Sequence, residues 1–131
     1  MTSRHFSESA VVFKPDMACD VVPLTPKLYQ HLDERYDQFH RHALIALHNF
    51  TADWSTWEIH PHGDEMVFLV SGEIEFLLNT ADGVETVLLN SSGSYVIVPK
   101  NTWHTARVKH AASCLFMTPG EGTLNADSPA G

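Results

Sequence analysis

Two histidines and a glutamate lie close together in the stretch WEIHPHGDEMVFLVSG, residues 57–72. His60 and His62 are two positions apart, so in a β-strand both side chains project from the same face and can point into a barrel. The glycine and aspartate that follow predict a tight turn, after which Glu65 can rejoin the histidines on the inner face. Two imidazoles and a carboxylate are a donor set that suits Fe, Mn, Zn, Ni or Cu. Alone, this stretch fits either a metal site along a strand or a polar loop rich in histidine, and a further ligand elsewhere in the chain would favour the metal site.

A third imidazole comes from a second stretch, GSYVIVPKNTWH, residues 93–104. An apolar strand is predicted to end there at a proline turn. The next strand begins with His104, which can deliver one more ligand from a neighbouring strand. His40 and His42 provide a contrast, because they have the same spacing as the first pair but follow a predicted helix. No carboxylate or third histidine lies at a useful distance in the sequence, so we interpret them as exposed polar side chains.

The elements that must position these residues are mostly strands. One helix is predicted over residues 26–38, where a threonine and a proline mark its start and an apolar stripe follows. Short segments rich in β-branched and aromatic residues then alternate with turns. The predicted strands are residues 11–13, 43–50, 55–60, 65–70, 72–78, 85–90, 94–99, 104–110 and 112–118. The eight strands from residue 43 onward, at spacings near ten residues, predict an all-β barrel or jelly-roll sandwich.

Length and composition limit the classes of protein. The chain has 131 residues, enough for one domain with an N-terminal arm, strand and helix at 1–42, a barrel at 43–118 and a tail at 119–131. The formal net charge of −8 disfavours binding to nucleic acid or to an anionic membrane surface. No apolar run approaches the ~18–20 residues that span a bilayer.

The cysteines and the first residues bear on the compartment. Cys19 and Cys114 are far apart and form no CxxC pattern. The sequence leaves a disulfide between them open, but reduced thiols in a cytoplasmic protein are the simpler interpretation. The segment MTSRHFSESA has no apolar core of a secretion signal, which also predicts a cytoplasmic location.

Together the two stretches resemble the two motifs of the cupin superfamily. The first motif runs glycine, five residues, HxH, three or four residues, glutamate, six residues and glycine. His60, His62, Glu65 and Gly72 stand in its last four roles. The sequence departs from the motif in two ways, because Trp54 replaces the leading glycine and only two residues separate the second histidine from the glutamate.

The second motif runs glycine, five residues, proline, one residue, glycine, two residues, histidine, three residues and asparagine. Gly93, Pro99 and His104 match it at the family's spacing. Asn101 replaces the turn glycine, a mild change because asparagine tolerates a left-handed backbone. Val108 stands in place of the final asparagine.

The resemblance implies a double-stranded β-helix, an all-β barrel of two antiparallel sheets, with one N-terminal α-helix beside it. It implies that His60, His62, Glu65 and His104 hold one divalent transition metal, with one or two positions open to water or substrate. Small cupins are often dimers. An apolar outer face on so small a barrel would be covered by the N-terminal helix or by a second subunit, so we expect a homodimer.

Residues around the expected site indicate what it would bind. Glu58, two positions before His60, is a candidate acid–base or ligand-supporting residue, or else a partly exposed strand glutamate. His48 either faces the pocket or fills the barrel. The walls are mainly apolar with few cationic groups, which favours a neutral or aromatic small molecule over a phosphorylated one. We therefore expect a metal-dependent enzyme of the dioxygenase or isomerase type; the alternative is a non-catalytic module that senses a metal or binds a small ligand.

Overall fold

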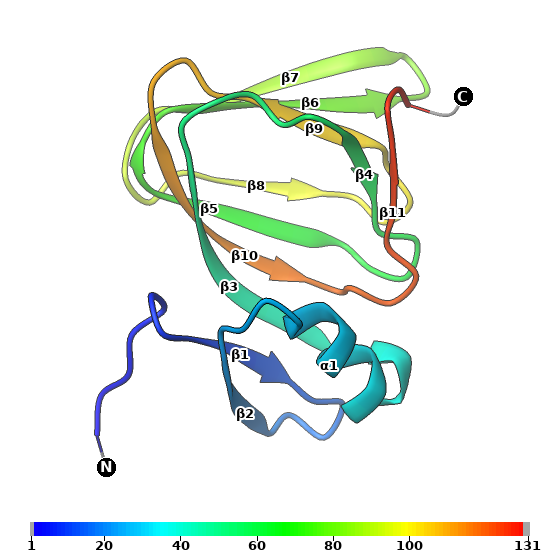
Figure 1. Ribbon diagram of the computed structural model, residues 1–131. Helices are drawn as coiled ribbons and strands as arrows, with labels where there is room; N and C mark the ends of the chain where they lie inside the picture. The colour runs from blue at the N-terminus through cyan, green and yellow to red at the C-terminus, as the bar shows by residue number, and fades with distance from the viewer. Residues whose placement is uncertain (1, 130–131) are drawn as a thin grey trace.

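The computed structural model describes residues 2–129, so positions 1, 130 and 131 of the predicted arm and tail lie outside the described residues. Eleven strands form most of the structure (Figure 1). They are β1 (Ser9–Phe13), β2 (Cys19–Pro23), β3 (Ala43–Phe50), β4 (Trp57–Ile59), β5 (Glu65–Gly72), β6 (Ile74–Thr80), β7 (Gly83–Leu89), β8 (Tyr95–Val98), β9 (His104–Arg107), β10 (Ala112–Thr118) and β11 (Leu124–Ala126). One α-helix, α1 (Leu28–Arg35), and one 3₁₀ helix, η1 (Asp37–Phe39), lie between β2 and β3.

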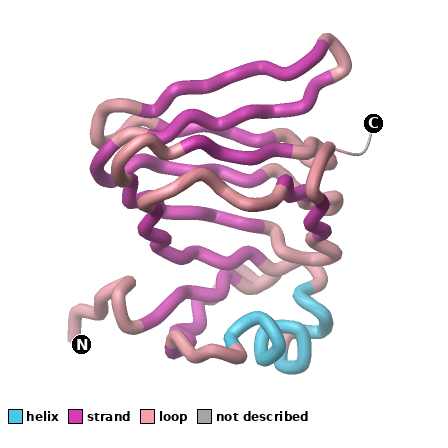
Figure 2. The backbone as a smooth tube through the Cα atoms, turned by 45° about the horizontal axis from the view of Figure 1, so that its top comes forward, coloured by secondary structure: helices cyan, strands magenta, loops and turns pink. Residues whose placement is uncertain are grey.

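The strands form two antiparallel sheets that face each other (Figure 2). The six-stranded sheet has the order β2-β1-β3-β10-β5-β8, and the five-stranded sheet has the order β11-β4-β9-β6-β7. Side chains from both sheets fill the space between them, as the core cluster that joins Leu69, Phe76, Val98 and Phe116 shows. This arrangement confirms the all-β double-stranded β-helix predicted from the sequence.

Alternation of side chains along the strands explains why these segments pair as they do. In β5, Glu65, Val67 and Leu69 are buried, whereas the residues between them are more accessible. In β9, His104 and Ala106 are buried in the same way. A period of two is what a strand with one face on the core requires. The eight strands predicted after residue 42 are all present, and β3 and β10 match their predicted bounds.

Gly72 lets the chain pass directly from one sheet to the other. It ends β5 in the six-stranded sheet, and only one residue separates it from β6 in the five-stranded sheet. Its φ is +87°, a left-handed value that favours glycine, and a Cβ atom there would collide with the Ala111 carbonyl. The same carbonyl accepts a hydrogen bond from the backbone N–H of Glu73, at 3.1 Å, which holds the crossing in place.

The N-terminal segment enlarges the six-stranded sheet. β1 pairs with both β2 and β3, so the β1–β2 hairpin continues the sheet beyond the barrel (Figure 1). The sequence predicted only part of β1 and none of β2. Helix α1 packs on this extension through Leu32, which lies in one apolar cluster with Val12, Leu44 and Ala46. Leu44 and Ala46 share the inner face of β3 with residues that line the central cavity. The helix therefore covers the inner face of the sheet extension, and the apolar outer face is left uncovered by it.

The helix is shorter than predicted. It covers Leu28–Arg35 within the predicted 26–38, and the sequence placed its start too early at the Thr25-Pro26 step. It cannot continue past residue 36, because Asp37, Gln38 and Phe39 have φ values of 53°, 53° and 62°. Left-handed backbone in non-glycine residues is incompatible with a right-handed helix. No helix among residues 2–129 is long and apolar enough to cross a membrane.

The segment after β10 is more ordered than the sequence suggested. Residues 119–131 were predicted only as a tail without a strand, but β11 pairs with β4 along three residues, Leu124 with Ile59, Asn125 with Glu58 and Ala126 with Trp57. The C-terminal segment therefore adds an edge strand beside the strand that carries the predicted site.

Candidate metal centre

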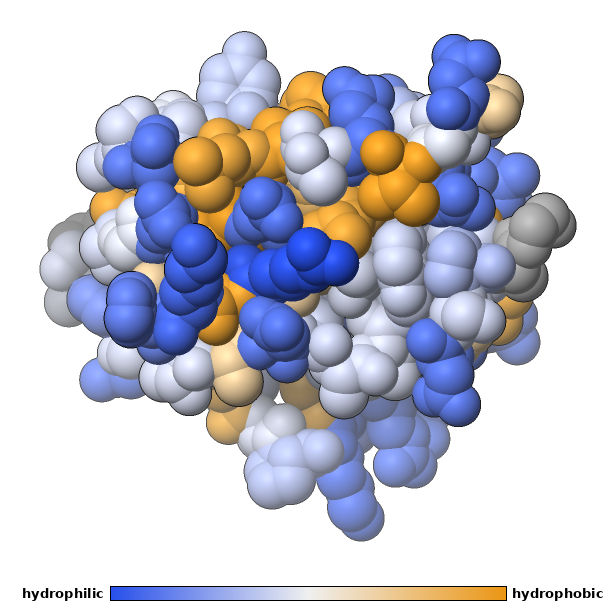
Figure 3. Space-filling model, turned by 90° about the horizontal axis from the view of Figure 1, so that it is seen from above, coloured by the Kyte–Doolittle hydropathy of each residue, from blue (hydrophilic) through white to orange (hydrophobic). Residues whose placement is uncertain are grey.

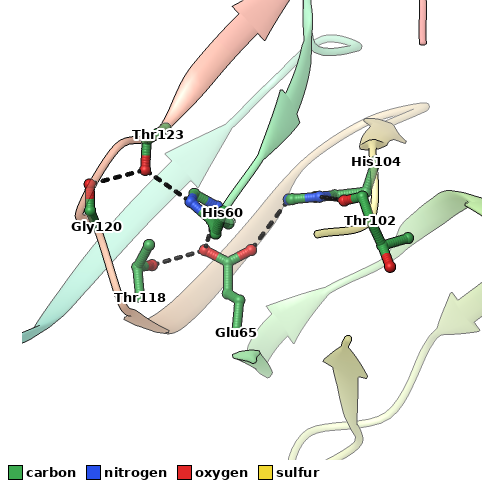
Figure 4. A network of polar contacts seen from close by, with 7 residues as sticks. All are labelled: His60, Glu65, Thr102, His104, Thr118, Gly120 and Thr123. Atoms are coloured by element: carbon green, nitrogen blue, oxygen red, sulfur yellow. Dashed lines mark hydrogen bonds and ion pairs between the residues drawn. The ribbon is translucent and has the colours of Figure 1, made fainter. Parts of the chain in front are cut away.

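Four ionisable side chains converge inside the barrel. Glu58 lies in β4 and His60 directly follows that strand, while Glu65 and His104 are the first residues of β5 and β9. Antiparallel pairing sets Glu58 opposite His104. One ligand atom from each of Glu58, His60 and His104 lies within 4.8 Å of the other two. The carboxylate of Glu65 lies between the imidazoles, 3.2 Å from His60 Nε2 and 3.1 Å from His104 Nε2 (Figure 4).

Three of these side chains are almost completely buried. The exposed fraction is 4% for His60, 2% for Glu65 and 0% for His104. Among residues 2–129, no other histidine, aspartate, glutamate, lysine or arginine is buried. Burial of ionisable groups costs free energy unless a partner of opposite charge or a metal compensates it. Their concentration at one point indicates a binding site.

Hydrogen bonds on the far side of each imidazole fix which nitrogen faces the centre. His104 Nδ1 lies 3.0 Å from the Thr102 carbonyl, which can only accept, so Nδ1 carries a proton. His60 Nδ1 lies 2.8 Å from the Thr123 hydroxyl. That hydroxyl donates its own proton to the Gly120 carbonyl at 3.0 Å, and it therefore accepts from His60 (Figure 4). In the neutral form both rings present an unprotonated Nε2 to the centre, which is the arrangement of a histidine that binds a metal.

Three buried polar atoms at the centre lack hydrogen bonds within the described residues. They are His60 Nε2, His104 Nε2 and Glu65 Oε1. The two Nε2 atoms lie at ion-pair distance from Glu65, but neither makes a hydrogen bond to one of its oxygens. Unsatisfied buried atoms are uncommon and call for a partner. A cation among these atoms would satisfy all three, so the residues present fit a metal ion.

The charges at the centre also favour a cation. Burial by itself would raise the pKa of Glu65, but contacts with His104 and His60 outweigh it and lower the pKa to about 2. Thr118 donates a hydrogen bond to Glu65 Oε2 at 2.6 Å and holds the carboxylate in place. Burial, followed by the negative charge of Glu65, raises the pKa of Glu58. Burial lowers the pKa of His104, but the Glu65 carboxylate more than offsets this and the net pKa is raised. The two carboxylates thus attract positive charge, either as protons on imidazole or as a metal ion.

His62 is the predicted site residue that the structure does not bring to the centre. Its side chain is 57% exposed, and its Nδ1 lies 4.0 Å from Glu121 Oε2 at the surface. Residue 62 was expected to continue the strand, but β4 ends at Ile59 and residues 61–63 form a turn. The rule that residues two apart share a face holds only within a strand, so it was wrong to expect His62 on the inner face beside His60.

In the structure Glu58 takes the role of the first histidine of the motif, and His60, which was assigned that role from the sequence, takes the role of the second. Glu58 and His60 are the pair two residues apart that points inward, and they belong to the three residues whose ligand atoms meet. Four residues then separate His60 from Glu65, which is within the three or four of the family motif. The gap of two residues counted in the sequence arose because His60 and His62 were taken as the motif pair in place of Glu58 and His60. The centre therefore contains two imidazoles and two carboxylates, with Glu58 in place of a third imidazole.

A cavity of about 720 Å³ opens beside the centre. Glu58, His60 and Glu65 form part of its wall, whereas His104 lies behind them. The volume is in the range of small-molecule sites. The other walls are aromatic, aliphatic and small polar side chains, together with two aspartates, from α1, η1, β3, β10 and the segments 52–56 and 120–125.

His48 lies in this cavity wall, as one of the two sequence interpretations held. Its ring packs against Phe50 and Phe116, with ring centroids 6.2 Å and 5.2 Å apart. Burial lowers the pKa of His48, so the ring favours its neutral form. Its position between two aromatic rings makes it part of the wall of the cavity.

Sequence reasoning missed the residues that hold the ligand side chains. Thr118, Thr123 and the Thr102 carbonyl contact Glu65, His60 and His104. Two of these contacts join residues 53 and 63 positions apart. A threonine in an unassigned tail gives no signal of such a contact, because only the fold brings it to the site.

No protein-family profile matches the chain, and no curated protein matches it at the level of sequence. Solved structures do match. A cupin-2 domain protein from Shewanella frigidimarina is 17% identical and has a TM-score of 0.51, with 59% of this chain and 70% of that one covered. Hydroquinone 1,2-dioxygenase from Sphingomonas sp. TTNP3, solved with 4-hydroxybenzoate bound, is 16% identical with a TM-score of 0.51, and 60% of each chain is covered.

Oxalate decarboxylase from Bacillus subtilis, a protein with Mn(II) centres, is 15% identical with a TM-score of 0.51. The match covers 65% of this chain and 23% of the decarboxylase. The chain thus spans less than two thirds of the two enzymes. At these identities the likeness establishes the fold, and it agrees with the fold expected from the two sequence motifs.

Proposed function

We propose that this cupin-fold protein is a metal-dependent enzyme that acts on a small neutral or aromatic molecule, as an oxidoreductase of the dioxygenase type or as an isomerase. In this proposal Glu58, His60, Glu65 and His104 hold one divalent transition metal, and the cavity beside them receives the substrate. The donor set of imidazole nitrogens and carboxylate oxygens suits Fe, Mn, Zn, Ni or Cu. Similar structures that include a dioxygenase and a protein with Mn(II) centres support this class of function.

The observation that carries the proposal is the orientation of the two imidazoles. Each ring is held from outside through Nδ1, and each directs an Nε2 without a hydrogen bond toward the same carboxylate. A structural ion pair between His60, His104 and Glu65 would need hydrogen bonds across the contact, and these are missing among the described residues. A metal site needs rings that are held through Nδ1 and direct an unprotonated Nε2 at the ion, and both rings have this orientation.

When bound, the metal would act as a Lewis acid and offer open coordination positions to a substrate oxygen. The residues of the chain prepare the site for this. Thr123 and the Thr102 carbonyl keep the protons of His60 and His104 on Nδ1. Thr118 orients Glu65.

Glu58 is suited to a second role besides ligation. It lines the cavity, and the pKa of its carboxyl group is raised by burial and by Glu65. A carboxyl group with a raised pKa beside a substrate cavity can exchange a proton with a bound ligand.

Metal analysis of the purified protein tests the site. We expect about one transition-metal ion per chain in the wild type and none in His60→Ala or His104→Ala. His62→Ala is the matched control, since it removes an imidazole two residues away that lies outside the centre, and it should keep its metal. A wild-type protein that binds none of Fe, Mn, Zn, Ni or Cu after reconstitution would overturn the proposal, and loss of metal in His62→Ala would return that residue to the ligand set.

Turnover distinguishes an enzyme from a binding module. Oxygen uptake by the iron-loaded protein should rise with one or more members of a panel of phenols and thiols, and Glu58→Gln should abolish that rise. If no metal form converts any substrate while metal binding persists, the protein is a non-catalytic cupin that senses a metal or binds a ligand.

We also propose a homodimer, formed through the outer face of the six-stranded sheet. Two rows of apolar side chains cross this face in register. The first row is Val21, Val11, Ile45, Met117, Met66 and Ile97, and the second is Leu47, Leu115, Phe68 and Tyr95. By contrast, the top of the barrel over β6 and β7 mixes hydrophilic and apolar groups (Figure 3). A second copy is the partner that suits the face, because two acidic chains can meet there without placing like charges in contact.

The oligomeric state in solution tests the dimer. Light scattering after size-exclusion chromatography should give twice the chain mass of 14.6 kDa. Phe68→Glu, at the middle of the second row, should give a monomer, and Val84→Glu on exposed β7 should leave the dimer intact. A monomeric wild type at micromolar concentration would overturn this assignment.

Both cysteines are free, which supports the proposed cytoplasmic location.

A further inference from the structure

The outer end of the cavity is formed by helix α1 and η1. Tyr29, Leu32, Asp33 and Phe39 from these two elements line it. Tyr29 and Asp33 are four residues apart in the helix, so they lie on the same face, one turn above the other. Tyr29 is 63% exposed because its ring borders open space. A phenol ring and a carboxylate thus stand side by side at the entrance.

Within residues 2–129, the lining of the cavity carries negative charge and includes no lysine or arginine. Its carboxylates are Asp33, Asp53, Glu58 and Glu65. The metal proposed above would compensate the last two, and Asp53 accepts a hydrogen bond from the Val108 N–H at 2.8 Å. Asp33 makes no ion pair or side-chain hydrogen bond within residues 2–129. It is therefore the carboxylate of the lining that is free to hold a cation.

Aromatic rings form another part of the cavity wall, and one of them contacts the centre. Phe50 contacts Trp54 and Phe116, with ring centroids 5.6 Å and 5.9 Å apart. Trp54 also lies edge-on to His104, at 6.0 Å. The indole Nε1 of Trp54 is buried and has no hydrogen-bond partner among the described residues. A planar ring with an oxygen substituent fits this wall, because it can stack on the aromatic groups and accept from the indole N–H.

We propose that the cavity selects aromatic molecules that carry an oxygen donor at one end and a protonated amine at the other. The oxygen end lies at the metal centre and the amine lies against the Tyr29 ring and the Asp33 carboxylate. This inference rests on the proposed function for the oxygen end, but the amine end depends only on the entrance residues. A carboxylate and an aromatic face are the two groups that bind ammonium ions best in a partly exposed site. The absence of lysine and arginine from the lining disfavours an anion of the same shape.

Three probes of matched shape test the amine end: tyramine, 4-ethylphenol and 3-(4-hydroxyphenyl)propanoate. All three share a phenol with a two-carbon arm. The arm of tyramine carries an ammonium group, that of the propanoate carries a carboxylate group, and that of 4-ethylphenol carries no further group. Binding is measured by quenching of tryptophan fluorescence, since Trp54 lines the cavity, and by calorimetry, with metal-free and Zn²⁺-loaded protein. We expect tyramine to bind about 3–10-fold more tightly than 4-ethylphenol. The carboxylate probe should bind more weakly than either.

Variants of the helix locate the effect. Asp33→Asn should remove most of the preference for tyramine and leave the affinity for 4-ethylphenol unchanged. Glu34→Gln is the matched control, because it removes the same charge from the next residue, which accepts from Gln30 at the helix surface and is not part of the lining. Equal affinities for the three probes, an equal loss of all three in Asp33→Asn, or no binding of any probe would each overturn the inference. If the wild type binds no metal but keeps the preference for tyramine, the proposed function fails and the amine site stands.

Discussion

Two clusters, each of two histidines and one glutamate, lie on either side of Pro61. They have the same composition but differ in burial and in the hydrogen bonds of their imidazoles. The inner cluster is His60, Glu65 and His104. The outer cluster is His40, His62 and Glu121. In the inner cluster the exposed fractions are between 0% and 4%, whereas the outer histidine side chains are 58% and 57% exposed.

The clusters also use their imidazoles in opposite ways. In the outer cluster His40 directs Nδ1 at Glu121, at 2.7 Å, so the ring nitrogen meets the carboxylate directly. In the inner cluster Nδ1 is held by a threonine hydroxyl or a carbonyl, and the other nitrogen faces Glu65. Residue type alone therefore does not distinguish the proposed metal site from a surface cluster. Burial and a second hydrogen bond to each ring distinguish it, and both come from tertiary structure.

The glutamates should give the largest contrast. Glu65→Gln removes a buried charge from the inner cluster, and metal affinity should fall by more than the ~10–100-fold that the loss of an outer hydrogen bond costs. Glu121→Gln makes the same change in the outer cluster and should leave affinity unchanged. Competition titration with a chromophoric chelator measures both. A comparable loss in Glu121→Gln would mean that the clusters act together, which would contradict the contrast.

The threonine behind His60 should give the next largest effect. Thr123→Val keeps the shape of the side chain and removes the acceptor at His60 Nδ1, so metal affinity should fall ~10–100-fold. Thr86→Val, on exposed β7, is the matched control and should have no effect. If Thr123→Val binds metal as tightly as wild type, the orientation of His60 does not depend on this hydrogen bond.

Acid unfolding of the metal-free protein should show a smaller difference between the Glu65→Gln and Glu121→Gln variants. The pKa of Glu65 is lowered from 4.5 to about 2 in the folded state, so its contribution to stability is complete above pH 4.5 and is lost as the pH falls from there toward 2. Glu65→Gln should lack that part of the acid transition. Circular dichroism measures the transition. The pKa of Glu121 is also lowered, but this side chain is 21% exposed at the surface and solvent screens its charge, so Glu121→Gln should follow the wild-type curve. Identical curves for all three proteins would mean that Glu65 gains nothing from its histidine neighbours.

The smallest expected effect lies in the outer cluster itself. The hydrogen bond from His40, followed by its charge, lowers the pKa of Glu121 against a smaller opposing effect of burial. His40→Ala should therefore raise that pKa toward 4.5, as carboxyl chemical shifts in an NMR titration would report. His42→Ala, which leaves the contact intact, is the control. An unchanged Glu121 pKa in His40→Ala would show that the surface pair does not form in solution.

The barrel could be predicted well from the sequence because its strands carry their own signal. β3 and β10 have the predicted bounds, and alternation of buried and exposed positions marks β5 and β9. The second strand was missed, since CDVVP offers five residues with a proline and only one buried side chain, Val22. It is held in place by pairing with β1 rather than by its own pattern. The end of α1 was missed because the left-handed residues after it include no glycine to mark them.

The centre was predicted in part. His60, Glu65 and His104 were identified from spacing and meet in the structure, while His62 was included because a period of two was applied across a strand end. Glu58 was considered as an acid–base residue, and its place beside His104 follows from strand register, which a single sequence does not reveal. The pair that points inward is Glu58 and His60, not His60 and His62, because β4 ends at Ile59.

The hydrogen bonds of Thr118 and Thr123 have a consequence for the order of events during synthesis. The ligand residues leave the ribosome early, but the groups that orient two of them come 53 and 63 residues after their partners. A nascent chain released only as far as residue 117 has all four proposed ligands and neither threonine. Capture of the ion is therefore expected late, when the segment that leads into β11 closes over the barrel, and a free chelator present during translation would compete with that last step.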